Sequence, residues 1–461
     1  MRIKLFEHYW HLGLIVLWLA ESAVIFGCSW LAYELFGDPR HLIFAVWIQS
    51  IVLGGCVILA MISMGLMSRR LRDRMAGIVL RIVLSMGAGA IIGTLLLGLT
   101  PEHRPPFAQV AAFVLFGCIA LVLLRGIASG LIDDDLFKRS VLVYGAGVNA
   151  GRIAQLRRRA DQRGFRVVGY VPSRNEERVI SADRLVASEK PLSALARELE
   201  IDEIVVAMDD RRQQFPLKEL LDCRLGGVEI TELATFLERE TGKVYLDILV
   251  PSWMIFGTGF RRDIARLYSE RAFDVLASFA LLVIAAPFML LTMLAIKLED
   301  GLGAPVLYGQ PRVGYAGRLF RVLKFRSMRV DAEKDGKARW AQANDDRITR
   351  VGRFIRKTRI DELPQLLNVL RGHMSFVGPR PERPEFVKQL SDTIPYYEER
   401  HAVKPGITGW AQLCYPYGAS EQDAVEKLQY DLYYVKNHGL LFDILILLQT
   451  VEVILLGKGA R

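Results

Sequence analysis

The chain has 461 residues, of which 52% are hydrophobic and 24% are charged. This composition excludes a disordered chain and a small disulfide-rich scaffold. The apolar residues are concentrated in a few long runs, which argues against a purely soluble enzyme. The net charge of +9 favours anionic lipid or phosphate-bearing substrates as partners, and no nucleic acid is expected. The five cysteines form no Cys-x-x-Cys pair, so the sequence predicts neither a disulfide framework nor a zinc site.

Four apolar runs near the N-terminus predict a membrane domain. They lie at about 12–35, 42–67, 82–99 and 107–124. Because a helix needs about 20 residues to cross a ~30 Å hydrocarbon core, we expect a bundle of four transmembrane helices within residues 1–130. Glu21 lies inside the first run. It is either a functional intramembrane acid or an acid that faces a neighbouring helix or a partner subunit.

The loop charges predict the orientation of these helices. Residues 68–74 join the second and third runs and hold four arginines, whereas the other two loops hold one each. The positive-inside rule places the arginine-rich loop in the cytoplasm. The chain after the fourth helix is then cytoplasmic as well, and the protein is expected to be multi-pass.

After the fourth run the pattern changes to alternating short strands and helices, which is typical of an α/β domain. Strands are expected at 140–144, 165–171 and 203–208. We interpret residues 138–250 as a Rossmann-like domain and residues 251–270 as a linker to the last part of the chain.

A glycine-rich turn follows the first of these strands. Residues 145–150 match Gly-x-Gly-x-x-Ala, the fingerprint of a dinucleotide-binding turn. The acid that binds the ribose, about 20 residues further on in such domains, is missing, because residues 170–173 read Tyr-Val-Pro-Ser. The turn by itself is consistent with nucleotide binding, but the missing acid favours a structural or regulatory domain.

A fifth apolar segment, residues 272–298, has 27 residues and reaches ~40 Å as a helix, which is enough to cross a membrane. Crossing would place the Arg- and Lys-rich region that follows outside the cytoplasm, against the positive-inside rule. Pro287 lies in the middle of the segment and bends a helix there. We therefore predict a re-entrant helix, with a kinked transmembrane span as the alternative. Residues 440–456 are apolar with polar interruptions and predict an interfacial helix.

Two features of the last third indicate phosphate chemistry. Lys324 and Arg326 alternate after a strand-like run, so they share one face, and two cations on one face suit a diphosphate. Leucines at helical spacing over 363–370 predict a helix, and Asp361 then falls at or beside its N-cap with Glu362 next to it. The helix dipole and nearby arginines favour the ionised carboxylate, which makes Asp361 a candidate nucleophile and Glu362 a candidate metal ligand. Ordinary helix capping by two acids is the alternative.

Four motifs occur in the order seen in the bacterial sugar transferases, the monotopic polyprenyl-phosphate phosphoglycosyl transferases. They are Lys-Phe-Arg-Ser-Met at 324–328, Asp-Glu-Leu-Pro-Gln at 361–365, Gly-Pro-Arg-Pro-Glu at 378–382 and Lys-Pro-Gly-Ile-Thr-Gly-Trp at 404–410. The resemblance covers about residues 267–461. The N-terminal plan resembles the large members that prime exopolysaccharide synthesis. The resemblance implies that residues 271–461 form an α/β catalytic domain on the re-entrant helix.

The resemblance implies an enzyme, a glycosyl-1-phosphate transferase that works in two steps. Asp361 attacks the β-phosphate of a UDP-sugar and releases UMP, and the phosphosugar then passes from Asp361 to undecaprenyl phosphate. The resemblance further implies that Glu362 binds Mg²⁺, that Arg356 contacts phosphate and that Arg380 contacts the nucleotide. The break in the membrane helix corresponds to Pro287. The sugar is left open.

The partners that the resemblance implies are UDP-sugar, undecaprenyl phosphate and the lipid of the bacterial inner (cytoplasmic) membrane, with a homodimer through the N-terminal half as the expected assembly. One rival function is a membrane-bound NAD-dependent nucleotide-sugar oxidoreductase or dehydratase with NAD on residues 145–150. The missing ribose acid and the lack of an obvious Tyr-x-x-x-Lys pair count against it. The other rival is a non-enzymatic lipid-linked transporter or scaffold. It needs more spans or a polar pathway, for which only Glu21 is a candidate.

Overall fold

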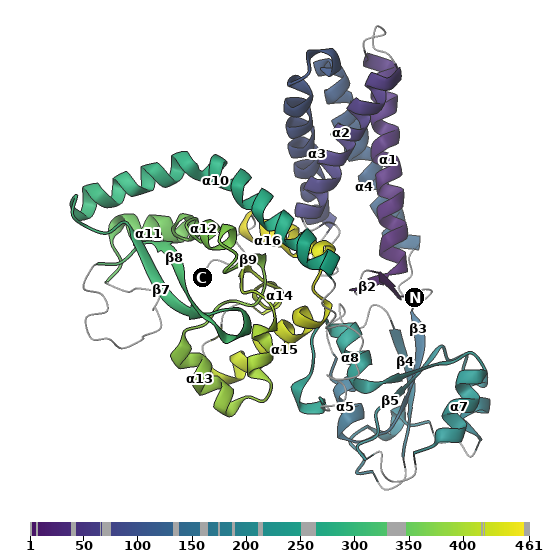
Figure 1. Cartoon of the computed structure of the whole chain (residues 1–461). Helices are drawn as coiled ribbons and strands as arrows, with labels where there is room; N and C mark the ends of the chain where they lie inside the picture. Colours follow the sequence, from purple (N-terminus) through teal and green to yellow (C-terminus); the bar gives the residue numbers. More distant parts are fainter. Residues whose placement is uncertain are drawn as a thin grey trace. The chain divides into compact units, whose positions relative to one another are not determined.

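The computed structural model describes residues 2–5, 8–37, 43–64, 66, 75–131, 138–156, 165–173, 176–186, 190–210, 215–249, 264–329, 347–415, 418 and 420–455. The whole arginine-rich loop predicted at 68–74, and most of the linker predicted at 251–270, lie outside these residues. The chain divides into two compact units, Met1–Ile248 and Leu249–Arg461, and each has hydrophobic clusters of its own. Figure 1 shows the ribbon coloured along the chain.

Four long helices occupy the first part of the N-terminal unit (Figure 1). α1 packs against α2 and α4, and α3 packs against the same two helices. Leu53, Met86 and Phe113, one from each of α2, α3 and α4, are fully buried between them. The elements of this part are β1 (Arg2–Leu5), β2 (His8–His11), α1 (Leu12–Phe36), α2 (Ile43–Ser63), α3 (Met75–Gly98), η1 (Pro101–His103) and α4 (Phe107–Leu131).

In the described part of the chain, five helices are long and apolar enough to cross a membrane, namely α1 to α4 and α10 (Ile264–Asp300). The prediction of a membrane protein is confirmed at this level, and insertion of α1 to α4 as a transmembrane bundle stays a prediction. Glu21 of α1 is fully buried and accepts hydrogen bonds from Arg125 of α4, from Nε at 2.5 Å and from Nη2 at 3.1 Å. This pair agrees with an acid that faces a neighbouring helix.

The rest of the N-terminal unit is an α/β domain on a four-stranded parallel sheet with the strand order β4-β3-β5-β6. Val141, Val143 and Val205 of the central strands are fully buried. The α/β prediction is confirmed, and the Rossmann-like classification stays a prediction. The elements are β3 (Arg139–Tyr144), α5 (Val148–Ala154), β4 (Phe165–Val171), η2 (Ala182–Arg184), α6 (Leu192–Glu198), β5 (Glu203–Val206), α7 (Leu217–Leu225), β6 (Glu229–Glu232), α8 (Leu233–Thr241) and η3 (Leu246–Ile248).

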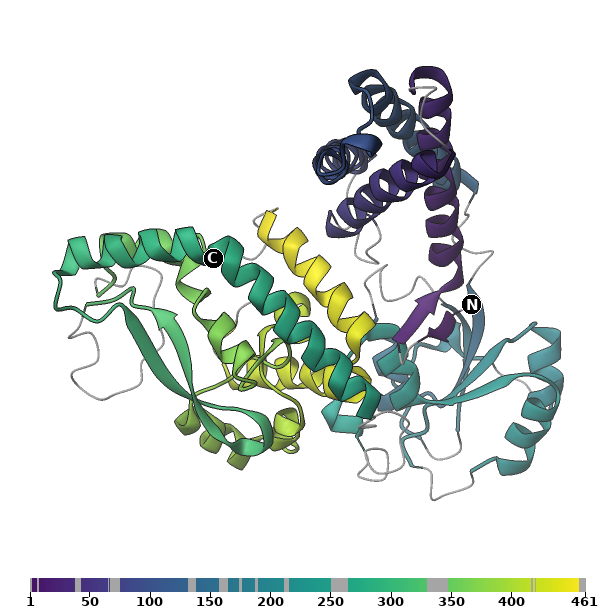
Figure 2. The same cartoon turned by 45° about the horizontal axis from the view of Figure 1, so that its top comes forward.

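The described part of the C-terminal unit begins with α10, one helix of 37 residues with Pro287 inside it. Figures 1 and 2 show its ribbon changing direction part-way along, as a proline inside a helix predicts. The second half of α10 packs through Met289 and Ile296 onto Phe325 of β8. This contact fixes α10 to β8, the strand in which the first motif begins. Entry and exit of α10 on one face of a membrane stay a prediction.

Short strands and helices follow α10. β7 and β8 form an antiparallel hairpin, and β9 and β10 are parallel neighbours. The segment predicted as an interfacial helix is α16, and its position in a membrane stays a prediction. The elements are β7 (Leu307–Val313), η4 (Tyr315–Gly317), β8 (Leu319–Phe325), α11 (Arg350–Lys357), η5 (Ile360–Glu362), α12 (Gln365–Leu370), β9 (Ser375–Val377), α13 (Pro384–Thr393), η6 (Tyr397–Ala402), β10 (Gly406–Thr408), α14 (Trp410–Cys414), α15 (Glu421–Asn437) and α16 (Leu440–Leu455).

The pairing of β9 with β10 joins the third and fourth motifs. Gly378 N donates to Thr408 O at 2.9 Å, and Gly406 N donates to Pro379 O at 3.0 Å. A Cβ atom on Gly378 would overlap the carbonyl oxygen of Lys404, so this close approach of two backbones requires glycine. Two motifs that are 26 residues apart at their first residues, 378 and 404, therefore form one wall.

Candidate active site

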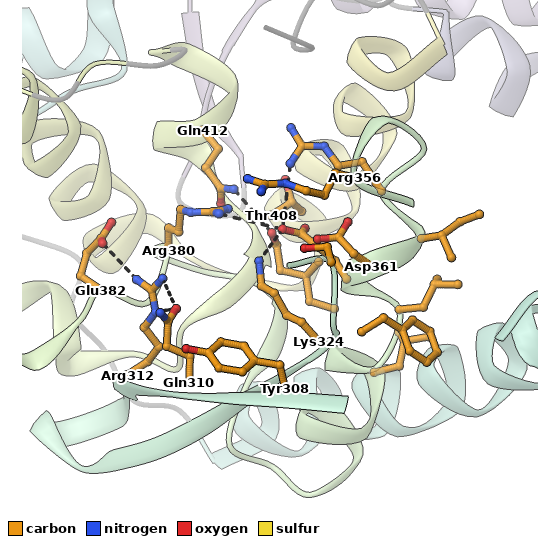
Figure 3. Close-up of a pocket in the computed structure, with 18 of the residues that line it drawn as sticks. Tyr308, Gln310, Arg312, Lys324, Arg356, Asp361, Arg380, Glu382, Thr408 and Gln412 are labelled. Atoms are coloured by element: carbon orange, nitrogen blue, oxygen red, sulfur yellow. Dashed lines mark hydrogen bonds and ion pairs between the residues drawn. The ribbon is translucent and has the colours of Figure 1, made fainter. Parts of the chain in front are cut away.

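A cavity of about 1160 Å³ in the C-terminal unit brings the four motifs together. Figure 3 shows Lys324, Arg380 and Gln412 converging on the space beside Asp361. Pro287 is not among the lining residues, although its neighbour Phe288 is. The lining includes every other residue that the sequence assigns to catalysis, substrate or metal: Lys324, Arg326, Arg356, Asp361, Glu362 and Arg380.

One wall of the cavity is apolar and belongs to α10. Leu281, Ile284 and Phe288 line it, and their side chains are 43%, 65% and 55% exposed. Their spacing of three and four residues puts them on one face of the helix. The cavity therefore has cations on one side and an exposed stripe of a long apolar helix on another.

Asp361 lies in η5, a single 3₁₀ turn, and not at the N-cap of the next α-helix. α12 begins only at Gln365, with Pro364 at its N-cap, so the prediction that Asp361 lies at or beside the N-cap of this helix is wrong, and the alternative of ordinary capping by Asp361 is not favoured. Arg359, with a φ of 60°, separates this turn from α11. Leu363 and Pro364, which has no N–H group, stand between the turn and α12. The N–H of Glu362 donates to Arg359 O at 3.2 Å within this turn. A helix dipole therefore does not explain the electrostatics of Asp361.

Asp361 is 8% exposed, and this burial raises its pKa above the ordinary value. The charge of Glu362 adds to the rise. The charges of Lys324, Arg356 and Arg359 oppose the rise without cancelling it. The surroundings were expected to favour the ionised form, but they shift the pKa of Asp361 upward instead, because the loss of solvent around Asp361 exceeds the effect of the cations. Asp361 Oδ1 is buried and has no hydrogen-bond partner in the part of the chain that the structure describes.

Glu362, the next residue, meets three cations. Its Oε1 accepts from Lys324 Nζ at 2.9 Å and lies 3.9 Å from Arg380 Nη2 and 4.0 Å from Arg359 Nη1. Burial by itself raises the pKa of Glu362, but Lys324 and Arg380 outweigh it and hold the pKa at about 2. Glu362 is therefore ionised over the whole physiological range, next to an acid whose pKa is raised.

The two remaining predicted cations have different surroundings. Arg326 is 7% exposed and donates to Asp300, the last residue of α10, at 2.5 Å. Lys324 points to Glu362 instead, so the pair predicted to share one face lines one cavity but has different partners. Arg356 lies in the last turn of α11 and acts on Asp361 through its charge.

Sequence reasoning missed several residues of the cavity. Thr408 Oγ1 shares a hydrogen bond of 2.8 Å with Thr450 Oγ1 of α16, and Gln412 Oε1 is buried with no partner among the described residues. Thr408 lies in the fourth motif and Gln412 just after it, so the motif was the sequence signal from which both could have been predicted. Arg312 lies in β7, outside all four motifs, and no local pattern marks it. Tertiary contacts bring it to the site: β7 pairs with β8, and Val313 N of β7 donates to Glu382 O.

Asp361 and Glu362 each have a carboxylate oxygen that takes no part in the contacts given above, and such oxygens fit Mg²⁺. Mg²⁺ in phosphoryl sites usually takes one or two carboxylates from the protein and its other ligands from phosphate and water. Asp361 Oδ1 has no partner among the described residues, and the contacts given above for Glu362 all use Oε1. In the described ranges no group of three or more His, Cys, Asp and Glu side chains forms a complete metal site. A metal here would therefore depend on phosphate ligands from the substrate.

The glycine-rich turn of the N-terminal unit is occupied by carboxylates of the chain itself. Asp209 accepts from the N–H groups of Val148 and Asn149 at 2.9 and 2.8 Å. Glu176 accepts from Ala146 N at 2.9 Å and from Asp209 N at 2.7 Å. These are backbone donors of the kind that hold a pyrophosphate in a dinucleotide site. Their use within the chain does not favour the NAD-dependent alternative.

Comparison with known proteins places the chain in a family. A model described as "Bacterial sugar transferase" matches residues 265–457. A UDP-N-acetylgalactosamine-undecaprenyl-phosphate N-acetylgalactosaminephosphotransferase of Aeromonas hydrophila is 43% identical over 52% of this chain and 56% of that protein. An undecaprenyl-phosphate glucose phosphotransferase of Komagataeibacter xylinus is 34% identical over 70% of this chain and 60% of that protein. An undecaprenyl-phosphate galactose phosphotransferase of Salmonella typhimurium is 30% identical over 75% of this chain and 74% of that protein.

The family match and the cavity agree in position, because every residue that lines the cavity lies between 265 and 457. The chain belongs to the bacterial sugar transferase family. The alignments span 56% and 60% of the length of the first two relatives named above. The three names share undecaprenyl phosphate and differ in the sugar.

Proposed function

We propose that this protein transfers a sugar-1-phosphate from a UDP-sugar to undecaprenyl phosphate and releases UMP, as the first membrane step of exopolysaccharide synthesis. The observation that carries the proposal is the buried, unpartnered Oδ1 of Asp361 in a cavity lined by cations. The family membership supports the same reaction class.

In the first step, Asp361 Oδ1 attacks the β-phosphorus of the UDP-sugar. The bond from that phosphorus to the bridging oxygen breaks, UMP leaves with the electron pair, and the phosphosugar is held on the Asp361 carboxylate. Lys324, Arg356 and Arg380 are proposed to hold the diphosphate and to stabilise the charge on the leaving group. Mg²⁺ at Glu362, when bound, neutralises further phosphate charge.

In the second step, a phosphate oxygen of undecaprenyl phosphate attacks the same phosphorus. The bond to Asp361 breaks, the carboxylate is restored, and the sugar leaves on a lipid diphosphate. The apolar stripe of α10 beside the cavity supports a lipid acceptor, because Leu281, Ile284 and Phe288 are exposed next to the charged wall. Arg326, with its buried guanidinium on the cavity wall, is proposed as a further phosphate contact.

We further propose that α10 is re-entrant and that the catalytic unit faces the cytoplasm at the bacterial inner membrane. A soluble donor then reaches the cavity from water and the lipid acceptor reaches it from the bilayer. The basic residues after α10 and the bend in that helix support this arrangement. A homodimer is proposed as the assembly.

The test separates the two steps. UDP-sugar without undecaprenyl phosphate should release about one UMP per active enzyme in a burst. Mass spectrometry should then find the added phosphosugar on the peptide that contains Asp361. Asp361→Asn keeps the shape but removes the nucleophile, so turnover should fall by about four or more orders of magnitude, the scale seen for removed nucleophiles. UMP release that requires undecaprenyl phosphate, with no trapped adduct, would contradict the covalent mechanism. A donor screen scored by UMP release identifies the sugar.

A further inference from the structure

The segment that carries Arg380 is irregular, yet its backbone is held at every residue. Residues 378–383 have no helix or strand, and prolines at 379 and 381 remove two backbone N–H groups. Regular backbone pairing therefore cannot fix this segment, and its carbonyl groups need donors from elsewhere. The structure supplies such donors from three different elements.

Four consecutive carbonyl oxygens each accept one hydrogen bond of 3.0 Å. Gly406 N donates to Pro379 O, and Val313 N donates to Glu382 O. The two carbonyls between them are reached by arginine side chains. The acceptors and donors are Pro379 with Gly406, Arg380 with Arg400, Pro381 with Arg312, and Glu382 with Val313.

Each of the two arginines is held by acceptors of its own. Arg400 is 5% exposed and donates to Asp431 of α15 from Nε at 3.1 Å and from Nη2 at 2.8 Å. Arg312 lies 3.3 Å from Glu382 Oε2 and donates from Nη2 to Gln310 Oε1 at 2.7 Å, contacts that Figure 3 shows. A guanidinium with several fixed partners has a fixed position, so it holds the carbonyl it contacts in a fixed place.

The side chain of Arg380 extends from this held backbone toward the acids. Its Nη2 lies 3.9 Å from Glu362 Oε1, the side chain is 43% exposed to solvent, and it lines the cavity. A side chain that is this exposed gains little order from its own packing. Its direction therefore depends on the backbone from which it starts.

We propose that Arg312 and Arg400 are positioning residues that hold the Arg380 backbone, so that the Arg380 guanidinium meets the donor nucleotide next to Glu362. The proposal rests on the proposed function, which places Arg380 at the nucleotide. Arg312 and Arg400 also line the cavity, and the proposal is that they act through Arg380 and not on the reacting phosphorus. Arg312 suits a test better than Arg400, because it is partly exposed and Arg400 is fully enclosed.

The test is a double-mutant cycle on the full-length protein, with the dissociation constant of UMP as the readout. Arg380→Ala should weaken UMP binding about 10- to 100-fold, the range for a lost charge-assisted contact. Arg312→Lys keeps the charge but loses the several N–H donors of the planar guanidinium. It should weaken UMP binding about fivefold. In the Arg380→Ala background the same change should have an effect of less than about twofold, because the contact through which it acts is already gone.

Arg271→Lys is the matched control. Arg271 also holds two consecutive carbonyls, those of Val369 and Leu370 at the end of α12, at 2.7 and 2.6 Å. Any effect of this change on UMP binding should be the same in both backgrounds. Thermal unfolding of each variant confirms that it is folded.

An equal effect of Arg312→Lys in both backgrounds would overturn the proposal, since Arg312 would then act on the ligand or on the fold directly. No effect in the wild-type background would overturn it as well. A wild-type protein that binds UMP but releases none from UDP-sugars would contradict the proposed function. The double-mutant cycle would still test the positioning of Arg380, because its readout is UMP binding. A wild-type protein that does not bind UMP would overturn both the nucleotide site and its positioning.

Discussion

Asp361 and Glu362 are adjacent in one 3₁₀ turn, yet their surroundings move their pKa values in opposite directions. Burial raises the pKa of Asp361, and Glu362 adds to the rise. Lys324 and Arg380 hold the pKa of Glu362 at about 2. An acid with a raised pKa is more basic when ionised, so its carboxylate is a better nucleophile than that of an ordinary Asp.

The raised pKa of Asp361 should be visible in how the rate of the UMP burst depends on pH. Attack requires the ionised form of Asp361, so the burst rate should fall as the pH falls through the raised pKa of Asp361, at a higher pH than for an ordinary Asp. Glu362→Gln removes the like charge, which lowers the pKa of Asp361. The acid limb of the profile, which is the fall of the burst rate at low pH, should therefore move to lower pH in this variant.

Glu382→Gln is the control for this pH profile. Glu382 also lines the cavity, but it pairs with Arg312 and is not among the charges that shift the pKa of Asp361. Its variant should keep the acid limb of the wild type. An acid limb that stays in place in Glu362→Gln, or that moves to higher pH, would contradict the assignment of the limb to Asp361.

At the scale of elements, α10 decides on which side of the membrane the active site lies. Single cysteines at Ser269 and Gly303, with the five native cysteines replaced, report on its two ends. Gly303 is preferable to Gly301, because a side chain at Gly303 meets open space whereas Gly301 has a φ of +88°. Both cysteines should resist an impermeant reagent in intact cells and react after permeabilisation, as a re-entrant helix requires.

A cysteine at Arg104 serves as the accessible reference for this labelling. Arg104 is an exposed residue between α3 and α4, in a loop that the positive-inside rule places outside the cytoplasm. Labelling at Gly303 in intact cells, to the extent seen at Arg104, would show that α10 crosses the membrane.

The glycine-rich turn of the α/β domain has a sequence consistent with nucleotide binding, but in the structure its backbone N–H groups bind carboxylates of the chain itself. Because Glu176 and Asp209 already accept its backbone N–H groups, NAD should not raise the melting temperature of the protein. Glu176→Ala should lower the free energy of unfolding of this domain by about 1–2 kcal/mol, since two backbone donors lose their acceptor. Glu177→Ala, at the next residue, should change it by less than about 0.5 kcal/mol. Stoichiometric NAD binding by the wild type would contradict this interpretation of the turn.

At the scale of the whole molecule, the division into two units separates the chemistry from the N-terminal half. Every residue that lines the cavity lies after Leu249. A protein that begins at Leu249 should therefore keep the UMP burst in nanodiscs, with a rate within about tenfold of the full chain. A folded protein of this length without the burst would show that the N-terminal unit contributes to the reaction.

The sequence by itself determined the features that depend on local pattern. Uninterrupted apolar runs are long enough to need a membrane, and four of them became α1 to α4. The strand at 165–171 was predicted to the residue. The motifs and the family resemblance singled out six residues, and all six line one cavity: Lys324, Arg326, Arg356, Asp361, Glu362 and Arg380.

The tertiary structure decided what local pattern does not contain. The sequence predicted Asp361 at or beside a helix N-cap with surroundings that favour its ionised form, but Asp361 lies in a separate turn before Pro364, and burial raises its pKa. Arg312 lies outside every motif and reaches Pro381 through long-range contacts, the pairing of β7 with β8 and the hydrogen bond from Val313 N of β7 to Glu382 O. Desolvation and long-range contacts arise when distant segments pack together, so they have no signature in a run of neighbouring residues.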